Sequence, residues 1–79
     1  MKIQVFIQNK VGVFDPEGKV IETGLKNLGF EAVSSAKMGK VITLDIETEN
    51  VEEAKQKVVQ MCDAFLVNPV LERYDIKVL

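Results

Sequence analysis

Hydrophobic and polar residues alternate along the first positions of the chain. The alternating apolar residues are Ile3, Val5 and Ile7. A period of two, rich in β-branched residues, predicts a half-buried strand over residues 2–8. Phe6 stands on the otherwise polar face, so it is either a single exposed aromatic or a contact with another subunit.

A helix is predicted to begin after a loop over residues 9–14. Asp15 is a good N-cap because its carboxylate accepts free amide hydrogens of the first turn. Pro16 then gives up a hydrogen that has no partner at the first helical position. The apolar positions that follow recur at helical spacing, at Val20, Ile21, Leu25 and Leu28. Gly29 predicts the end of the helix as a left-handed C-terminal residue.

The segment Ala32–Glu47 has a strand-like pattern that is stronger in its second half. The alternating apolar residues there are Ile42, Leu44 and Ile46. Gly39 interrupts the pattern, so either one long strand bends there or two short strands meet in a tight turn at Met38-Gly39. We favour the bent strand.

A second helix is predicted from Asn50, with Glu53 three residues later as in a capping box. Its apolar stripe consists of Val51, Ala54, Val58, Met61 or Cys62, and Phe65. Asn68-Pro69 would stop this helix, because proline disfavours a helical residue before it. Residues 70–79 would form the last strand.

This order of strand, helix, strand, helix and strand predicts a single α+β domain over residues 1–79. We expect a ferredoxin-like antiparallel sheet with two helices on one face. The uncovered face would hold Phe6, Val41 and Thr43, together with alternate residues of the last strand. Because several of these residues are apolar, we expect dimerisation to complete or cover the sheet.

The net charge and the cysteine content indicate which kinds of partner and which cellular compartment fit this chain. A net charge of −2 argues against a nucleic-acid surface, which needs a concentrated basic face. Cys62 is the single cysteine, so an internal disulfide is excluded and a reducing, cytoplasmic compartment fits best. No apolar stretch approaches the roughly 20 residues that cross a membrane, and the N-terminus does not have the pattern of a signal peptide.

The search for catalytic chemistry finds little. The chain has no histidine, the side chain most often used for proton transfer near neutral pH. Ser34 and Ser35 therefore lack a histidine partner, and Cys62 falls on an apolar stripe where a structural role is favoured. Four acidic residues near the second helix suit the helix dipole better than a metal ion. We expect no catalytic, cofactor or metal site in this chain.

Loops carry the remaining candidate residues. Lys37-Met38-Gly39-Lys40 places two cations beside a glycine, which indicates either a solvated turn or a contact with a partner's phosphate or carboxylate. Two other turns frame helix ends and would shape partner contacts. The full set of interface candidates is Asp15, Pro16, Gly18, Lys37, Gly39, Lys40, Asn68 and Pro69.

Five short motifs occur in a recognisable order. They are Asp15-Pro16-Glu17-Gly18, Leu28-Gly29-Phe30, Gly39-Lys40, Met61-Cys62, and Asn68-Pro69-Val70 with Tyr74 following. Each motif alone is common, but together they resemble the S-type subunits of phosphoribosylformylglycinamidine synthase, the PurS family. The resemblance runs from Val5 to Ile76. Members of that family often carry arginine where this chain has Lys37, which keeps the charge but loses the planar guanidinium.

The resemblance implies an accessory subunit that forms at least a dimer and performs no chemistry. It would bridge a large synthetase subunit, which binds ATP and Mg²⁺, to a glutaminase subunit. The complex converts formylglycinamide ribonucleotide, glutamine and ATP into formylglycinamidine ribonucleotide, with ammonia passing between active sites. Neither nucleic acid nor a membrane is an expected partner.

Two other functions use similar folds. An ACT-type ligand-sensing module would need a glycine-lined amino-acid site, for which Gly12 or Gly18 could serve. An acylphosphatase-type enzyme would need an arginine in an N-terminal anion-binding loop. The only arginine is Arg73, near the other end of the chain, which argues against that enzyme.

Overall fold

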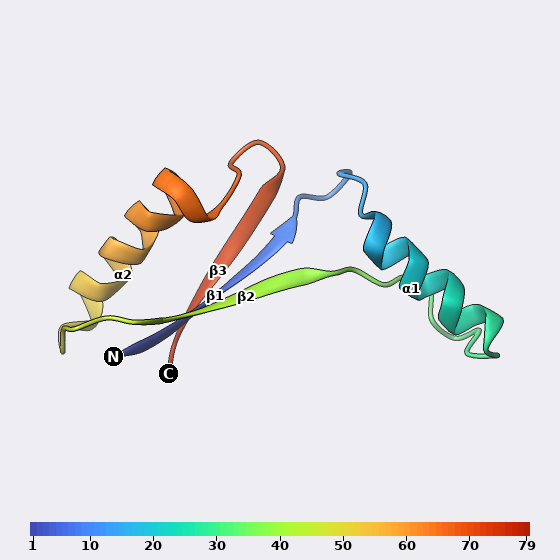
Figure 1. The fold of residues 1–79 in the computed structure, drawn as a ribbon, viewed down its shortest axis with the longest axis horizontal. Helices are drawn as coiled ribbons and strands as arrows, with labels where there is room; N and C mark the ends of the chain where they lie inside the picture. The colour runs from blue at the N-terminus through green and yellow to red at the C-terminus, as the bar shows by residue number, and fades with distance from the viewer.

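β1 (Lys2–Asn9) is the middle strand of a three-stranded antiparallel sheet in the computed structural model, which describes residues 1–79. Its neighbours are β2 (Gly39–Asp45) and β3 (Glu72–Val78). The helix α1 (Pro16–Asn27) connects β1 to β2, and α2 (Val51–Met61) lies between β2 and β3 in the chain (Figure 1). The predicted order of elements and the antiparallel α+β sheet are confirmed.

Both helices begin at the residues that the local sequence indicates. A side-chain oxygen of Asp15 accepts a hydrogen bond from the N–H of Gly18 at 3.0 Å, and Asn50 accepts one from the N–H of Glu53 at 3.0 Å. Gly29 has a φ of 99°, so it is the expected left-handed residue after α1. Neither helix combines the length and hydrophobicity that a bilayer-spanning segment requires.

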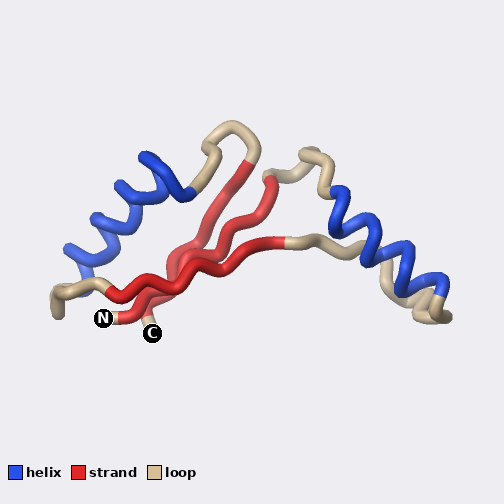
Figure 2. The backbone as a smooth tube through the Cα atoms, viewed as in Figure 1, coloured by secondary structure: helices blue, strands red, loops and turns tan.

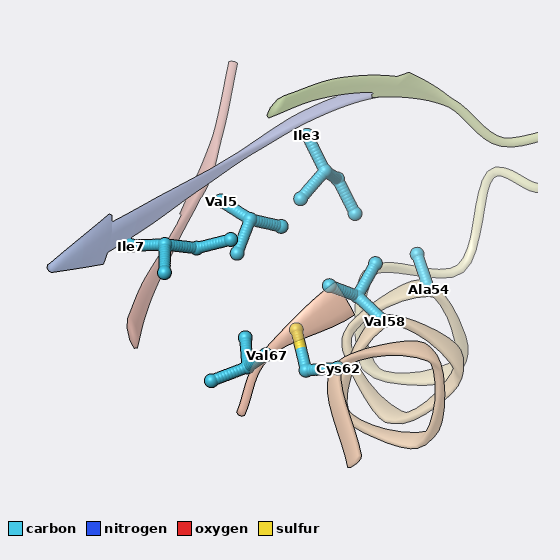
Figure 3. Packing of buried hydrophobic residues seen from close by; sticks show 7 residues of the cluster. All are labelled: Ile3, Val5, Ile7, Ala54, Val58, Cys62 and Val67. Atoms are coloured by element: carbon cyan, nitrogen blue, oxygen red, sulfur yellow. The ribbon is translucent and has the colours of Figure 1, made fainter. Parts of the chain in front are cut away.

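The hydrophobic core lies between one face of the sheet and α2. Apolar side chains of β1 point toward α2 and the segment that follows it (Figure 3). The buried residues of this cluster are Ile3, Val5, Ile7, Ala54, Val58, Cys62 and Val67. The cluster is small for a chain of 79 residues, so much of the chain's apolar surface is left outside it.

A turn of π-helix, η1 (Cys62–Leu66), extends α2 and changes which side chains face the sheet. Cys62 rather than Met61 enters the core, because it follows the buried Ala54 and Val58 at intervals of four residues, and the wider turn shifts the phase of the helix only after it. Phe65 points outward and is 88% exposed, whereas Val67 is buried. The prediction that Phe65 continues the apolar stripe is therefore wrong.

α1 belongs to an arm, residues 10–38, that projects from one end of the sheet on the side away from α2 (Figures 1 and 2). No residue of the arm belongs to the hydrophobic core. The prediction that both helices cover one sheet face is therefore wrong for α1. The register pairs Gln8 with Gly39, so the connecting chain leaves and re-enters the sheet at the same end, and Figure 1 shows α1 beyond that end.

The segment before β2 also differs from the prediction. Residues 31–38 form neither the favoured bent strand nor a hairpin but run back beside α1, and β2 begins only at Gly39 (Figure 1). A strand needs a neighbour to satisfy its backbone groups, and β1 has already ended where this segment lies. Instead, the N–H of Met38 donates to the carboxylate of Asp15.

The uncovered face of the sheet is more polar than expected. Phe6 lies between Val41 on β2 and Asp75 on β3. The two apolar residues of this face are Phe6, which is 37% exposed, and Val41, which is 54% exposed. Thr43 is exposed two positions along β2 from Val41. The last strand contributes charged residues to this face, namely Arg73, Asp75 and Lys77, because its apolar residues pack against the core.

Candidate protein-contact site at one end of the sheet

Two of the three turns singled out in the sequence, at Asp15-Pro16 and Gly39-Lys40, meet at the end of the sheet from which the arm leaves, and the third, at Asn68-Pro69, is joined to them through Glu72. A groove of about 210 Å³ lies there, between the end of β1, the start of α1 and the starts of β2 and β3. Its lining residues are Ile7, Gln8, Asn9, Asp15, Pro16, Glu17, Met38, Gly39, Lys40 and Glu72. Turns that are far apart in the sequence therefore form one continuous surface.

Asp15 joins two sides of this groove. One carboxylate oxygen accepts from the N–H of Gly18 at 3.0 Å, and the other accepts from the N–H of Met38 at 2.8 Å. These backbone hydrogen bonds, the one from Gly18 first, hold the pKa of Asp15 below its ordinary value of 3.8. The carboxylate thus remains charged at neutral pH and fixes the start of α1 to the approach to β2.

Two glycines permit the close contacts of this joint. A Cβ at Gly18 would lie 2.5 Å from the carbonyl oxygen of Ala36, and one at Gly39 would lie 2.8 Å from the carbonyl oxygen of Ile7. No larger residue fits at either position without moving backbone. The close contact with Ala36 explains why residue 18 is a glycine. A glycine at this position is therefore no evidence for the amino-acid site of an ACT-type module.

Glu72 is the second carboxylate of the groove and was not among the sequence candidates. It accepts a hydrogen bond from the N–H of Asn68 at 2.9 Å and lies 3.4 Å from the ammonium of Lys40. The bond from Asn68 is the main cause that lowers the pKa of Glu72 from its ordinary value of 4.5. The spacing of four residues between Asn68 and Glu72 could have indicated the hydrogen bond between them. The ion pair of Glu72 with Lys40 could not be found in this way, because Lys40 is distant in the sequence.

The turn at Asn68-Pro69 is also built from hydrogen bonds. The side-chain oxygen of Asn68 accepts from the N–H of Val70 at 3.0 Å, and the ammonium of Lys10 donates to the carbonyl of Pro69 at 2.6 Å. Lys10 is a second residue that the sequence analysis missed. Its side chain connects the residue that follows β1 to this turn, which lies 59 positions later in the sequence.

The remaining candidates lie beside the groove. Gly39 and Lys40 also line an adjoining hollow of about 240 Å³ that includes Phe6 and Val41. Lys37 is exposed and lines a smaller hollow with Asp15. Five of the predicted partner-contact residues, Asp15, Pro16, Lys37, Gly39 and Lys40, therefore lie close to two of the predicted dimer-face residues, Phe6 and Val41.

Cys62 lies outside this surface. Its side chain is fully buried in the core, and burial raises the pKa of its thiol above the ordinary value. A buried, protonated thiol is a poor nucleophile and a good packing group, which agrees with the structural role expected from the sequence.

A family model described as PurS, phosphoribosylformylglycinamidine (FGAM) synthase, matches residues 2–79 of the chain. The phosphoribosylformylglycinamidine synthase subunit PurS of Archaeoglobus fulgidus is 41% identical over 76 residues, which cover 96% of this chain and 95% of that protein. The crystal structure of Methanocaldococcus jannaschii PurS is similar with a TM-score of 0.88 at 42% identity, covering 96% of this chain and 92% of its own. A chain in the structure of PurLQS from Thermotoga maritima gives a TM-score of 0.90 at 37% identity, covering 99% and 95%.

Proposed function

This chain belongs to the PurS family of phosphoribosylformylglycinamidine synthase, and we propose that it is the adaptor of that complex, without a catalytic site or cofactor of its own. In this role it acts in the cytoplasm, in purine biosynthesis, as at least a dimer. It bridges a large synthetase subunit, which holds ATP and Mg²⁺, to a glutaminase subunit. Membership of the family and the PurLQS assembly of the similar Thermotoga maritima chain support the partners.

The observation that carries this proposal is the groove at the end of the sheet. Its walls come from four separate parts of the chain. Asp15 joins two of them by accepting a hydrogen bond from the backbone N–H of Met38, and Glu72 joins two of them through its ion pair with Lys40. A surface fixed in this way loses little conformational entropy when a partner binds to it. Groups at its rim, such as the 67%-exposed ammonium side chain of Lys40, remain accessible to a partner.

A rigid adaptor suits the chemistry of the complex. Ammonia released from glutamine must reach the synthetase site before it escapes into water, so the two active sites need a fixed relative orientation. The proposed part of this chain is to hold that orientation. It takes no part in bond making or breaking.

The test is reconstitution with the synthetase and glutaminase subunits. We expect the three proteins to purify together, and we expect glutamine-dependent amidation to require this chain. Amidation driven by added ammonium salt should persist in the synthetase without it, because external ammonia needs no bridge. Glutamine-dependent amidation at an unchanged rate without the chain would contradict the proposal, as would turnover of any substrate by the chain alone.

A further inference from the structure

The face of the sheet that α2 leaves uncovered contains a hollow of about 240 Å³. The buried residues of β1 point toward α2 (Figure 3), so Phe6 and Gln8, which alternate with them, point to the other face. Phe6 and Val41 are neighbours across β1 and β2 and form the apolar part of the hollow. Gly39 lies two positions before Val41 and has no side chain to fill the space. We call this space the sheet-face hollow.

Arg73 is the single arginine of the chain and lines the sheet-face hollow. One terminal nitrogen of its guanidinium donates to the side-chain oxygen of Gln8 at 3.0 Å, and the other donates to the carboxylate of Asp75 at 3.4 Å. These contacts orient the planar group across β1 and β3. The side chain is 53% exposed. A guanidinium has more N–H donors than these contacts use, so its remaining donors are available to another molecule.

The remaining donors of Arg73 suit a carboxylate. A guanidinium and a carboxylate match in shape and form paired, charge-assisted hydrogen bonds. Asp75 does not already fill this role, because its contact with Arg73 is long and its side chain is 76% exposed. An ion pair of this kind in water contributes little free energy. The sheet-face hollow therefore places an oriented cation beside an apolar depression.

The charges around the sheet-face hollow favour a different protein over a second copy of this chain. Its lining includes two cations, Lys40 and Arg73, and one anion, Asp75, whereas the whole chain has a net charge of −2. Two copies with their hollows opposed would bring these cations together. They would also place one hollow against another, so neither would be filled.

The sheet-face hollow is continuous with the groove at the end of the sheet. Gly39 and Lys40 line both. One partner can therefore cover the groove and the hollow together, which requires a broad surface. Of the two subunits that the adaptor bridges, the large synthetase subunit meets this requirement better.

We propose that the sheet-face hollow receives an apolar side chain of the synthetase subunit, while a neighbouring carboxylate of that subunit binds the guanidinium of Arg73. This inference rests on the proposed adaptor role and adds to it the chemistry of one contact. The apolar group would displace water from Phe6 and Val41, and the ion pair would fix the register of the two proteins.

The first test compares two charges at one position of the hollow. Val41→Glu and Val41→Lys both replace an apolar residue that is 54% exposed, where a polar side chain should leave the fold intact. Glutamate would repel the incoming carboxylate, whereas lysine would attract it. With labelled full-length chain and purified synthetase, we expect Val41→Glu to bind at least about tenfold more weakly than Val41→Lys. Equal affinities of the two variants would overturn the inference.

The second test reverses the charge of the arginine. We expect Arg73→Glu to weaken binding to the synthetase by about 100-fold. The matched control is Lys77→Glu, which makes the same charge reversal on the same strand and face but outside the hollow. We expect the control to bind as the unaltered chain does. Equal losses in the two variants would overturn the inference, and the Val41 pair decides it if Arg73→Glu does not fold.

Two further measurements separate the other possible occupants. We expect Arg73→Glu to change neither the affinity for purified glutaminase nor the mass of the chain alone in sedimentation velocity. A loss confined to glutaminase would assign the hollow to that subunit, and a changed mass would assign it to a second copy. Either result would overturn the inference and leave the adaptor role intact. An unaltered chain that binds neither subunit would overturn the adaptor role itself.

Discussion

The carboxylate of Asp15 accepts a hydrogen bond from the backbone N–H of Met38 at 2.8 Å, across 23 positions of the sequence. Because the same carboxylate caps α1 through Gly18, it fastens the start of the arm to the approach to β2. This one side chain therefore holds the outgoing and returning ends of the arm together.

Replacing Asp15 with alanine should loosen the arm more than the sheet. The variant loses the helix cap and the bond to Met38 together, so we expect Tm to fall by several degrees. Hydrogen exchange read by mass spectrometry should show faster exchange in residues 16–38 and little change in β1. The control Glu17→Gln removes a neighbouring charge but neither bond. Equal acceleration in β1 and in the arm would show that Asp15 supports the whole fold rather than this joint.

Acid should destabilise the chain through the same carboxylate. The pKa of Asp15 is lowered on folding from an ordinary value of 3.8, chiefly by the backbone bond from Gly18, and that of Glu72 from 4.5, chiefly by the bond from Asn68. A lowered pKa contributes stability that is complete above the ordinary value and is lost as the pH falls through the folded value. We therefore expect Tm to fall below about pH 4.5, and Asp15→Asn should reduce that fall when both proteins are compared by circular dichroism. An identical acid profile in the two would exclude this role for Asp15.

Gly39→Ala should weaken the pairing between β1 and β2. The added Cβ would lie 2.8 Å from the carbonyl oxygen of Ile7, which the sheet holds in place. We expect a loss of about 1–3 kcal/mol in the free energy of unfolding, measured with urea. Thr43→Ala, at an exposed position of the same strand, is the control and should cost less. An unchanged free energy of unfolding in Gly39→Ala would contradict this, because it would mean that the start of β2 can move away from Ile7 without loss of stability.

Lys40→Glu should weaken assembly with the synthetase subunit by about tenfold, because it reverses a charge that is accessible at the rim of the groove. The isolated fold should persist, because Lys40 is an exposed residue whose pair with Glu72 is near the surface. Affinity is measured with labelled chain and purified synthetase. Glu72→Gln is the control, since it removes the pair's negative charge while its side-chain carbonyl still accepts from Asn68. Equal losses in both variants would place the effect in the internal pair rather than in the partner contact.

Features set by neighbours in sequence were predictable. The alternation of Ile3, Val5 and Ile7 places β1 in the core, and Asp15 and Asn50 cap the helices that they were expected to cap. In each case the deciding interaction lies within a few residues, so the local pattern contains it.

Features set by long-range geometry were not predictable. α1 has the apolar stripe of a helix that covers a sheet, but it lies beyond the sheet end at which its connection leaves and re-enters (Figure 1). Phe65 follows helical spacing, yet the π-turn rotates it outward. The partners of Asp15 and Glu72 across the groove, Met38 and Lys40, depend on the register of β1 with β2 and leave no local signal. The candidate residues themselves were identified, but their assembly around one groove was not.

The separation between arm and core has a consequence for how the chain opens. Every contact among Ile3, Val58 and the rest of the hydrophobic cluster survives when the arm detaches, because the arm supplies none of them. Local opening of the arm is therefore a separate event from global unfolding and requires less free energy. A lone chain can fray at residues 10–38 while its sheet stays closed, and a newly made copy is most exposed to proteases there until it meets its first partner.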